Sequence, residues 1–362
     1  MSNETVLIIV NSVYQLLTAI HMKWTILNPY PVELLITDVT PGLVSLREQL
    51  ISTKLFLRVL SGSVKDLNET IKKSEKEMTE VFKRGRTVLR WQLSEELADY
   101  REIYFSNFDF FARLLAHVYY DHPCRFLWYE DGFSSYVIDY LKEERSQINK
   151  HAQGREIRDK VEKALLYEPR LARRGDKIPN MRLPKINPKD IDFIEMLNNI
   201  FQYQKPEHDP AFVFLEQSFR AEGISGNELF LMEQCKNAVA ANAFAVKPHP
   251  RNEINLPFNL GLTPKYEIGA PWELYLLNEQ NTDKTILTIC SNAALSAKLV
   301  LDLDIPTVML YRLYDGKVLW KEDDVLKRYL EQFRIQFAGN NYYVPKTIYE
   351  LKHILKYLGG QK

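Results

Sequence analysis

The stretch Thr5-Val-Leu-Ile-Ile-Val-Asn11 is a short apolar run rich in β-branched residues. In the residues that follow, 14–27, apolar side chains recur at helical spacing, at Leu16, Leu17, Ile20 and Trp24. The apolar run predicts a buried strand, and the spacing after it predicts a helix with one apolar face. This strand and helix decide the fold class, because the rest of the chain repeats them.

The same alternation continues through the first half of the chain. Further strands are expected at Val32–Thr37, Phe56–Leu60, Glu102–Ser106 and Arg125–Glu130. Helices are expected after Pro41, over Val64–Trp91 as one long charged helix, over Phe111–Tyr120 and after Gly132. Buried strands that alternate with helices indicate a parallel sheet that helices cover on both faces.

A second alternating series fills the other half. Its expected strands are Ala211–Leu215, Ala243–Lys247, Thr285–Cys290 and Thr307–Tyr311. Its expected helices are Asn227–Ala241, Ala293–Val300, Val325–Phe333 and Tyr349–Leu358. We therefore predict an α/β protein of two Rossmann-like, doubly wound domains, the arrangement called GT-B, with its active site in the interdomain cleft.

The sequence between the two series predicts the domain boundaries. The first domain is expected at 1–165 and ends with a charged helix over Glu156–Leu165. A proline-rich segment then predicts a linker region at 166–206. The second domain is expected at 207–345, and a C-terminal helix at 346–362.

Composition excludes several classes of protein. A length of 362 residues favours two domains, and 46% hydrophobic with 26% charged residues excludes a disordered chain. Lys and Arg together number 47, as do Asp and Glu, so the zero net charge gives no argument for a nucleic-acid partner. Three cysteines, Cys124, Cys235 and Cys290, form no CxxC pair and predict neither a disulfide framework nor a zinc site.

The two ends of the chain bear on its location. The N-terminus carries Glu4 where a signal peptide needs basic residues, and no apolar stretch approaches the length of a membrane span. We therefore expect an intracellular protein. The C-terminal helix places Lys352, His353 and Lys356 beside apolar residues, so it either rests on a membrane surface or packs across the domains with a solvated basic face. We favour the second interpretation.

The first candidate site is Trp128-Tyr129-Glu130-Asp131-Gly132, which follows an expected strand. Ligands of open parallel sheets bind at the carboxyl ends of strands. A carboxylate among aromatic residues there has its pKa raised toward neutrality, as a general base requires. The alternative is that Asp131 merely caps the helix that follows.

The second candidate site is Lys247-Pro248-His249-Pro250-Arg251, again at a strand end. The two prolines restrict the backbone around His249 and so hold the direction of its side chain. An imidazole between two cations suits the departure of a phosphate, which needs charge neutralisation and a proton. The alternative is a turn histidine whose neighbours are solvated, and we favour the functional interpretation.

Two smaller signals complete the set. In Cys290-Ser291-Asn292 a strand turns into a helix, where a hydroxyl, an amide and helix N–H groups suit a phosphate, although a plain helix cap fits equally well. Glu273, in Pro271-Trp272-Glu273, is a carboxylate that could accept the two hydroxyls of a ribose, although on its own this segment would be interpreted as a surface loop.

Several motifs are absent. The chain has no GxGxxG, no GxxxxGK[ST] and no GxSxG. Asp302-Leu303-Asp304 matches a metal-binding DxD but lies between an expected helix and strand, so we interpret it as a turn. The sequence therefore predicts no metal site and no cofactor.

In order, Glu130-Asp131-Gly132, His249-Pro250 and the serine motif at Ser291 resemble the bacterial sialyltransferases, whose families share D/E-D/E-G, HP and Ser-Ser/Thr motifs on a GT-B fold. Asn11-Ser-Val-Tyr-Gln-Leu-Leu17 and Phe214-Leu-Glu-Gln217 bring the chain closest to glycosyltransferase family 52. That family includes lipooligosaccharide and streptococcal capsule sialyltransferases. The resemblance spans about residues 5–315.

The resemblance implies a role for each matching residue. Glu130 would be the general base toward the acceptor hydroxyl, and His249 the general acid toward the phosphate of the CMP leaving group. The implied contacts to the donor come from Lys247, Pro248, Glu273, Ser291 and Asn292. Further implied substrate contacts come from Asp131, Gly132, Gln15, Gln217 and Arg251. The chain departs from the family at Cys290-Ser291-Asn292, where paired hydroxyls are expected.

The resemblance implies an inverting, metal-independent transfer of sialic acid from CMP-sialic acid to a terminal galactoside or sialoside of a bacterial surface glycan. The domain at 1–165 would then face the acceptor oligosaccharide, and the domain at 207–345 would bind the donor. A glycosyltransferase for another nucleotide sugar, such as a glucosyltransferase, and a non-catalytic nucleotide- or glycan-binding protein remain the alternatives. The expected location is the bacterial cytoplasm, with peripheral membrane contact and a homodimer both left open.

Overall fold

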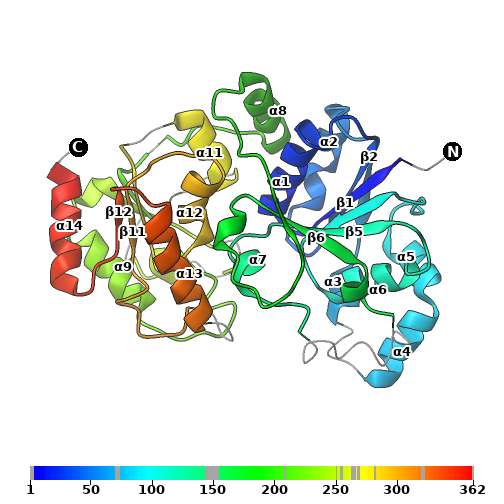
Figure 1. The fold of residues 1–362 in the computed structure, drawn as a ribbon. Coiled ribbons are helices and arrows are strands. Elements are labelled where there is room, and N and C mark those ends of the chain that lie inside the picture. Colours follow the sequence, from blue (N-terminus) through cyan, green and yellow to red (C-terminus); the bar gives the residue numbers. More distant parts are fainter. Residues whose placement is uncertain are drawn as a thin grey trace. The chain divides into compact units, whose positions relative to one another are not determined.

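The computed structural model describes most of the chain, namely residues 4–69, 74–142, 155–207, 209–249, 251–252, 256–261, 266, 270–280, 283–318 and 323–360. The chain divides into two compact units (Figure 1). Unit 1 comprises Met1–Pro184 and Asn199–Phe201, and unit 2 comprises Lys185–Asn198 and Gln202–Lys362. Each unit is built around its own sheet, as the two alternating series predict.

Unit 1 contains a seven-stranded sheet in the order β3-β2-β1-β4-β5-β6-β7, in which every pair is parallel. The strands are β1 (Val6–Val10), β2 (Val32–Thr37), β3 (Arg58–Gly62), β4 (Glu102–Phe105), β5 (Arg125–Tyr129), β6 (Val161–Leu166) and β7 (Asn180–Arg182). The first five match the expected strands to within two or three residues at each end. Every residue of β1 and β2 is buried, as expected of a parallel sheet covered on both faces.

The prediction of a charged helix over Glu156–Leu165 is wrong. The structure has a short 3-10 turn, η4 (Ile157–Asp159), followed by strand β6. Only the second half of β6 is buried, and its partner β5 pairs Tyr129 with Leu165. Tertiary pairing with β5 therefore overrides the helical tendency of the charged residues at the start of β6.

The prediction of a single long helix over Val64–Trp91 is also wrong. The structure has α3 (Lys65–Asn68), α4 (Glu75–Lys83) and α5 (Gly85–Gln92). A capping box between Ser74 and Glu77 begins α4, which marks a new helix. At Gly85 a Cβ atom would lie 2.7 Å from Cγ2 of Val118, so the start of α5 requires glycine for its close approach to α6.

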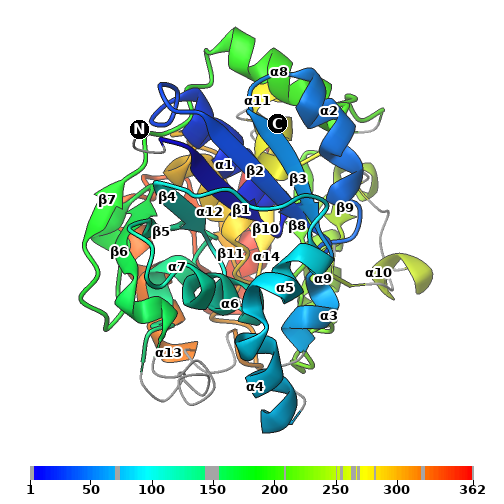
Figure 2. The ribbon, with the colours of Figure 1, turned by 90° about the vertical axis from the view of Figure 1, so that its right-hand side faces the viewer.

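Unit 1 has further helical elements (Figure 2). They are α1 (Val13–Trp24), η1 (Val44–Leu46), α2 (Arg47–Ser52), α6 (Phe110–Val118), α7 (Ser134–Val137) and η5 (Pro169–Leu171). Of these, α1 packs on β1 and α2 packs on β3. Side-chain oxygens of Ser12 and Asp109 cap α1 and α6, the helices that follow β1 and β4. Both caps therefore begin helices at the carboxyl edge of the sheet.

Unit 2 contains a five-stranded parallel sheet in the order β12-β11-β10-β8-β9. The strands are β8 (Phe212–Leu215), β9 (Phe244–Lys247), β10 (Thr285–Thr288), β11 (Thr307–Met309) and β12 (Tyr342–Tyr343). Its helical elements are α9 (Glu228–Lys236), η6 (Ala241–Ala243), α10 (Leu256–Asn259), α11 (Trp272–Glu279), α12 (Asn292–Leu299), α13 (Asp323–Gln336) and α14 (Ile348–Gly360). Four of the five strands are those expected, and β12 was missed.

Two further elements bear on the sequence predictions. The segment 166–206 contains β7 at the edge of the first sheet and α8 (Ile191–Phe201). In α14, Leu351, Leu355 and Leu358 are buried, and the helix packs on α9. These leucines are therefore not exposed toward a membrane surface. Among the residues that the structure describes, no helix is both long enough and apolar enough to cross a membrane.

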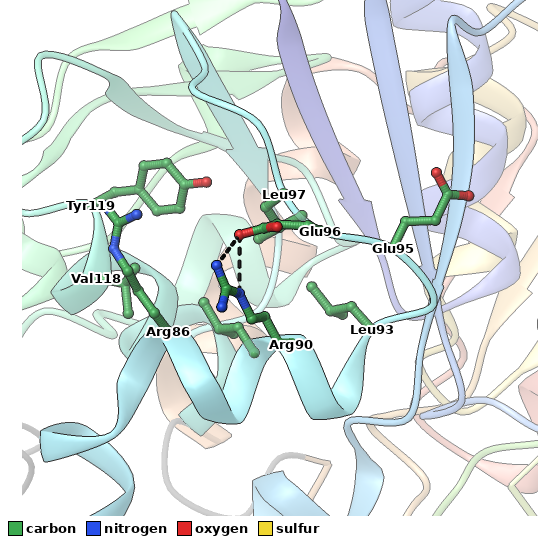
Figure 3. A pocket seen from close by; sticks show the side chains of 9 residues that line it. Arg86, Arg90, Leu93, Glu95, Glu96, Leu97, Val118 and Tyr119 are labelled. Carbon is green, nitrogen blue, oxygen red and sulfur yellow. Dashed lines mark hydrogen bonds and ion pairs between the residues drawn. The ribbon is translucent and has the colours of Figure 1, made fainter.

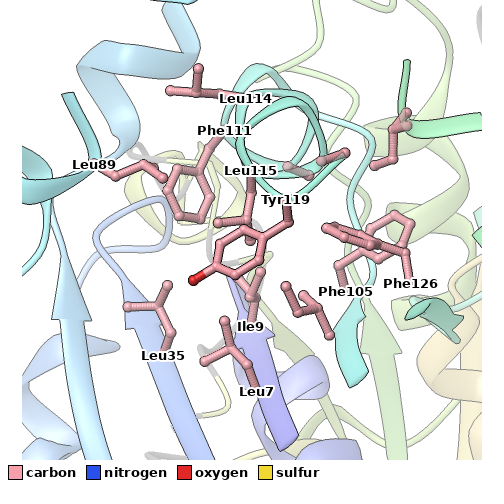
Figure 4. Packing of buried hydrophobic residues seen from close by; sticks show 14 of the residues in the cluster. Leu7, Ile9, Leu35, Leu89, Phe105, Phe111, Leu114, Leu115, Tyr119 and Phe126 are labelled. Carbon is pink, nitrogen blue, oxygen red and sulfur yellow. The ribbon is translucent and has the colours of Figure 1, made fainter. Parts of the chain in front are cut away.

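The core of unit 1 lies between the central strands and the helices α5 and α6 (Figure 4). Leu7, Ile9 and Leu35 contribute from the strands, and Phe111 and Leu115 from α6, all at most 4% exposed. This packing holds the start of α6 beside the carboxyl ends of β1 and β4, where the candidate site lies.

We expect Leu115→Ala to lower the free energy of unfolding by about 2–5 kcal/mol, because it leaves a cavity in this core. Urea unfolding followed by circular dichroism would measure the loss. The control is Leu57→Ala at a residue that is 59% exposed, for which we expect a change within about 0.5 kcal/mol. Equal losses in the two variants would contradict the assigned core.

Candidate active site

Glu130 immediately follows β5 at the carboxyl edge of the first sheet. Its backbone N–H donates to the carbonyl oxygen of Leu165 at 3.0 Å, which extends the pairing of β5 with β6 by one residue. The side chain is only 1% exposed. A carboxylate so buried is destabilised unless hydrogen-bond donors face it.

Three donors face the Glu130 carboxylate. The Tyr14 hydroxyl donates to Oε1 at 3.0 Å, and the backbone N–H of Tyr167 donates to Oε2 at 2.8 Å. The Tyr136 hydroxyl also donates to Oε2, and it accepts the N–H of Glu168 at 3.1 Å. These donors come from α1, from α7 and from the residue after β6, so three separate segments hold one carboxylate.

Burial raises the pKa of Glu130 to about 7, and the nearby Asp131 adds to the rise. The hydrogen bonds from Tyr136, Tyr167 and Tyr14 oppose burial because they favour the charged form. A carboxyl group with a pKa near neutrality has the strength that a general base needs at physiological pH.

Asp131 and Gly132 turn the chain away from β5. Gly132 has a φ of +67°, a conformation that favours glycine. The residue that precedes α7 is Phe133, and no side-chain hydrogen bond caps the helix, so Asp131 is not its cap. The Asp131 carboxylate instead accepts from Asn107 Nδ2 at 3.3 Å.

A network of amide side chains surrounds the ends of β1 and β4. Asn11 Nδ2 donates to Asn107 Oδ1 at 3.0 Å and to Asp109 Oδ2 at 3.1 Å. Gln15, which is 1% exposed, donates to the same Asn107 oxygen at 2.7 Å. Burial raises the pKa of Asp109 to about 6. The predicted residue Gln15 therefore lies inside this network, next to Asn107 and hence to Asp131.

In unit 2 the backbone of His249 is fixed by a buried carboxylate. Its N–H donates to Oε2 of Glu216 at 3.0 Å, and Arg220 donates to Oε1 of the same residue at 2.6 Å. Glu216 directly follows β8 and is 2% exposed. The neighbour Pro248 is partly buried, and Pro250 lies outside the described residues.

The His249 ring has a defined tautomer in its neutral form. Nδ1 accepts the backbone N–H of Arg251 at 3.2 Å, so the proton of the neutral ring is on Nε2. Burial, together with the cations of Arg251 and Lys247, lowers the pKa of His249 to about 4. In the free protein His249 is therefore neutral at pH 7 and offers Nε2–H as a donor.

Glu273 lies in the first turn of α11 and is 5% exposed. Burial raises its pKa, while a hydrogen bond from Ser296 of α12 and the charge of Lys247 at the end of β9 oppose the rise. Burial lowers the pKa of Lys247, and Glu273 opposes it. Two of the predicted donor-binding residues, Lys247 and Glu273, are thus neighbours. The Lys247 carbonyl accepts the N–H of Glu216 at 3.1 Å.

The serine motif lies between β10 and α12. Ser291 precedes α12 and its backbone N–H donates to the Thr288 hydroxyl at 3.1 Å, but its side chain makes no capping hydrogen bond. The Oδ1 atom of Asn292 is buried without a hydrogen-bond partner. Cys290 is buried, and its thiol donates to Gln217 Oε1 at 3.3 Å. The site where the family has paired hydroxyls therefore offers one hydroxyl and one uncommitted amide oxygen.

Two predicted residues have other partners. Gln217 is 7% exposed and also donates to the Thr288 hydroxyl at 3.2 Å, so it links the ends of β8 and β10. Arg251 pairs with Glu222 at 2.8 Å and donates to Ser218 at 3.1 Å. Glu228 accepts the backbone N–H of Gln217 at 2.9 Å, and burial raises its pKa to about 8.

The sequence predictions missed several residues of these sites. They are Tyr14, Asn107, Asp109, Tyr136, Tyr167, Glu216 and Glu228. Asn107, Asp109 and Glu216 follow expected strands, so the rule that located Glu130 would have found them. Tyr136 and Tyr167 have no local signal, and Tyr167 follows a strand that was expected to be a helix.

A cavity of about 30 Å³ lies in unit 1 between α5 and the segment before β4 (Figure 3). Arg86, Arg90, Glu96 and Tyr119 line it, and Arg90 donates to Glu96 at 2.6 Å. It holds about one water molecule and none of the predicted site residues lines it, so it is not the active site.

The DxD match at Asp302 is a turn, as interpreted. Asp302 has a φ of +56° and pairs with Lys185 at 2.9 Å and Lys298 at 3.2 Å. Within the described ranges, no group of three or more His, Cys, Asp or Glu side chains is arranged to hold a metal ion.

Comparisons with known proteins concern the fold. No family model matches the chain, and no curated protein matches it. The glycotransferase of kitacinnamycin is 11% identical over 99% of this chain and 91% of its own, with a TM-score of 0.54. A Listeria monocytogenes protein described as a UDP-N-acetylglucosamine 2-epimerase is 10% identical over 99% and 88%, also at 0.54. Arabidopsis thaliana UGT89C1 complexed with UDP-L-rhamnose is 12% identical over 100% and 91%, at 0.50. The chain therefore has the two-domain, Rossmann-like GT-B fold, as predicted.

Ionisation of Glu130 should destabilise the folded protein. Its folded-state pKa is raised from 4.5 to about 7, so stability is lost as the pH rises through this range, by about 3 kcal/mol. In Glu130→Gln the amide oxygen can accept from Tyr136 and Tyr167, and the amide nitrogen can donate to the Tyr14 oxygen. We therefore expect the variant to fold and to lack this loss, in urea unfolding at pH 5 and pH 8. Glu48→Gln, at an exposed side chain, is the control. An unchanged pH dependence in Glu130→Gln would refute the raised pKa.

His249 should titrate at a pKa of about 4 in the free protein. Arg251→Ala should raise that pKa, because it removes a cation and keeps the backbone N–H that holds Nδ1. Imidazole NMR signals followed against pH would measure both values, with Arg90→Ala, at an exposed arginine of unit 1, as the control. A wild-type pKa at or above the ordinary 6.5 would contradict the structure.

Proposed function

We propose that the chain is an inverting glycosyltransferase of the family 52 type, which transfers sialic acid from CMP-sialic acid to a hydroxyl of a galactoside or sialoside. The acceptor belongs to a bacterial surface glycan. The observation that carries the proposal is the position of the three motifs. Glu130, His249 and Ser291 follow the carboxyl ends of β5, β9 and β10, in the order that the bacterial sialyltransferases have. The GT-B fold supports it, because glycosyltransferases are among the proteins that share this fold.

The chemistry assigns a role to each unit. Glu130 in unit 1 takes the proton of the acceptor hydroxyl as the acceptor oxygen bonds to the anomeric carbon. The bond from that carbon to the CMP phosphate breaks, and the electron pair leaves with the phosphate. His249 in unit 2 donates a hydrogen bond from Nε2–H to that phosphate. The negative phosphate raises the pKa of the ring, so that Nδ1 takes a proton from solvent in place of its contact with the Arg251 N–H. The imidazolium then acts as the general acid through Nε2. One displacement of this kind inverts the anomeric configuration.

The donor contacts follow from unit 2. Ser291 and the first N–H groups of α12 bind the phosphate, since a helix N-terminus favours an anion. Glu273 accepts the ribose hydroxyls, and backbone groups around Lys247 face the cytosine. The side-chain amide nitrogen of Asn292 supplies the second donor to the phosphate in place of the family's second hydroxyl, since Oδ1 can only accept.

The first test is transfer itself. Purified protein with CMP-sialic acid and lactose or a sialoside should release CMP and form a sialylated product. Glu130→Gln and His249→Ala should each lose about 10²–10⁴-fold in turnover, since each removes a general acid or base. His353→Ala, at a histidine on α14, should keep full activity. The pH profile of kcat/KM should rise through about pH 7 in the wild type as Glu130 ionises.

The outcomes of this assay separate the alternatives. If the protein forms product with a UDP-sugar and none with CMP-sialic acid, the proposed donor is wrong and the class, glycosyltransferase, remains. Binding of CMP without turnover on any acceptor would favour a non-catalytic binding protein. Full activity in Glu130→Gln would remove Glu130 from the role of base.

The second test concerns metal. A monophosphate leaving group is neutralised here by His249 and helix N–H groups, so we expect EDTA to leave the initial rate of transfer unchanged. A metal-dependent glycosyltransferase assayed in parallel would confirm that EDTA removes the ions. Activity that EDTA abolishes and Mg²⁺ or Mn²⁺ restores would contradict a metal-independent mechanism.

A further inference from the structure

The Glu130 carboxylate is enclosed by groups that differ in their exposure. Glu130 is 1% exposed, and Tyr136 and Tyr167, which hold Oε2, are 0% exposed. Tyr14, which holds Oε1, is only half-buried. Of the three residues seen to donate to the carboxylate, Tyr14 is thus the one whose surface is partly exposed to solvent.

The backbone of Tyr14 is firmly placed. The residue lies in the first turn of α1, where Ser12 accepts the N–H of Gln15 with its side chain at 3.2 Å and that of Leu16 with its carbonyl at 2.9 Å. The Thr18 hydroxyl donates to the Tyr14 carbonyl at 3.1 Å. Since α1 packs on the central strand β1, the position of the phenol is set by the sheet that also places Glu130.

We infer that the acceptor hydroxyl contacts Tyr14 rather than Glu130, and that the Tyr14 hydroxyl relays the acceptor proton to Glu130 Oε1. This inference rests on the proposed function. A direct contact would require the acceptor to displace Tyr14 from a carboxylate that is otherwise enclosed. The relay requires only the 3.0 Å hydrogen bond that the structure already contains.

The proton relay accounts for every bond that forms and every bond that breaks. The acceptor O–H bond breaks as the acceptor oxygen bonds to the anomeric carbon, and its proton moves to the Tyr14 oxygen. The Tyr14 proton moves to Glu130 Oε1, so Tyr14 stays neutral and Glu130 becomes the neutral acid. The electron pair of the broken bond to phosphate leaves with CMP. Solvent then removes the proton before the next turnover.

Other titratable groups beside Glu130 do not offer this path. Asp131 is the adjacent carboxylate and is held by Asn107. His21 of α1 is 3% exposed and lies at 3.4 Å from the Tyr167 hydroxyl, whereas Tyr167 holds Glu130 through its backbone N–H. Tyr136 donates to Oε2 from a fully buried position.

The kinetic test is Tyr14→Phe in the full chain, assayed with CMP-sialic acid and an acceptor at saturation. We expect kcat to fall by about 10²-fold or more while the KM of the donor stays unchanged, because the proton path is lost and donor binding is not. Fluorotyrosines at position 14 should restore activity, with a rate that varies with the acidity of the phenol. A hydroxyl that only holds the carboxylate in place would show no such variation.

The matched control is Tyr104→Phe. The Tyr104 hydroxyl donates to Glu102 Oε2 at 2.8 Å, and this buried pair lies near the amino end of β4, away from Glu130. The variant therefore removes the same kind of hydrogen bond from the same unit, and we expect it to keep full activity.

A second measurement needs no substrate. The difference between infrared spectra of the wild type and Glu130→Gln isolates the Glu130 carboxyl band, and its titration gives the pKa. Tyr14→Phe should raise that pKa because a donor to the charged form is lost, and Tyr104→Phe should not. No change in Tyr14→Phe would overturn the inference, because the hydrogen bond would then be absent in solution.

The outcomes separate the inference from the proposed function. A wild type that uses no nucleotide sugar overturns both. A wild type that transfers sialic acid while Tyr14→Phe keeps or gains activity overturns the relay alone, because Oε1 then takes the proton directly. Transfer that fails in Tyr14→Phe and recovers with the acidity of a fluorotyrosine supports both.

Discussion

Both sheets are entirely parallel, and helices cover their faces, so polar chemistry is confined to the strand ends. Every residue of β1, β2, β8 and β10 is buried. An apolar strand between two layers of helices has little place for a charged side chain except at or near its ends. Glu33, the second residue of β2, is buried there only with Arg58 and Tyr100 donating to it. Parallel pairing brings all the carboxyl ends of one sheet to the same edge. Residues as distant in the chain as Asn11, Asn107 and Asp131 are therefore linked by consecutive hydrogen bonds at that edge. The candidate site in each unit is a consequence of this constraint.

At the edge of the first sheet, two opposing effects set the properties of Glu130. Removing the carboxylate from water favours its neutral form, and three hydrogen-bond donors favour its charged form. Burial prevails, and the resulting pKa of about 7 corresponds to about 3 kcal/mol in favour of the proton. The donors still matter, because without them so buried a group would stay protonated at neutral pH and could not act as a base. Their rigidity also matters. Two of them belong to fully buried residues, so the carboxylate keeps one orientation.

Much of this arrangement could be predicted from the sequence, and the physical reason differs between the parts that could and could not. The buried strands were predicted because each is a continuous apolar run bounded by polar residues. β6 was not, because it begins with charged residues and becomes a strand only by pairing with β5. β7 is fully exposed and β12 has two residues, so neither has an apolar run to detect. Glu130 and His249 were located because they follow predictable strands. The groups that hold Glu130 were not, because Tyr167 follows β6 and Tyr136 lies in a four-residue helix. A strand-end rule finds the candidate group and says nothing of the partners that tertiary structure brings to it.

Burial shifts the pKa of an acid in unit 1 and the pKa of a base in unit 2. In unit 1 burial raises the pKa of an acid, and in unit 2 burial and the cations of Arg251 and Lys247 lower the pKa of a base. Both shifts favour the neutral form. In the free protein His249 is therefore neutral at pH 7, whereas Glu130, with a pKa of about 7, is about half ionised at that pH. In the proposed reaction, the donor phosphate would stabilise the imidazolium of His249, and the proton of the acceptor hydroxyl would neutralise Glu130. Such a site does not need a strongly basic surface to attract its anion. This agrees with a chain in which 47 basic and 47 acidic residues cancel. Buried carboxyl groups such as Glu216 and Glu273 are tolerated beside His249 and Lys247 because each is matched by a donor or a cation in its own unit.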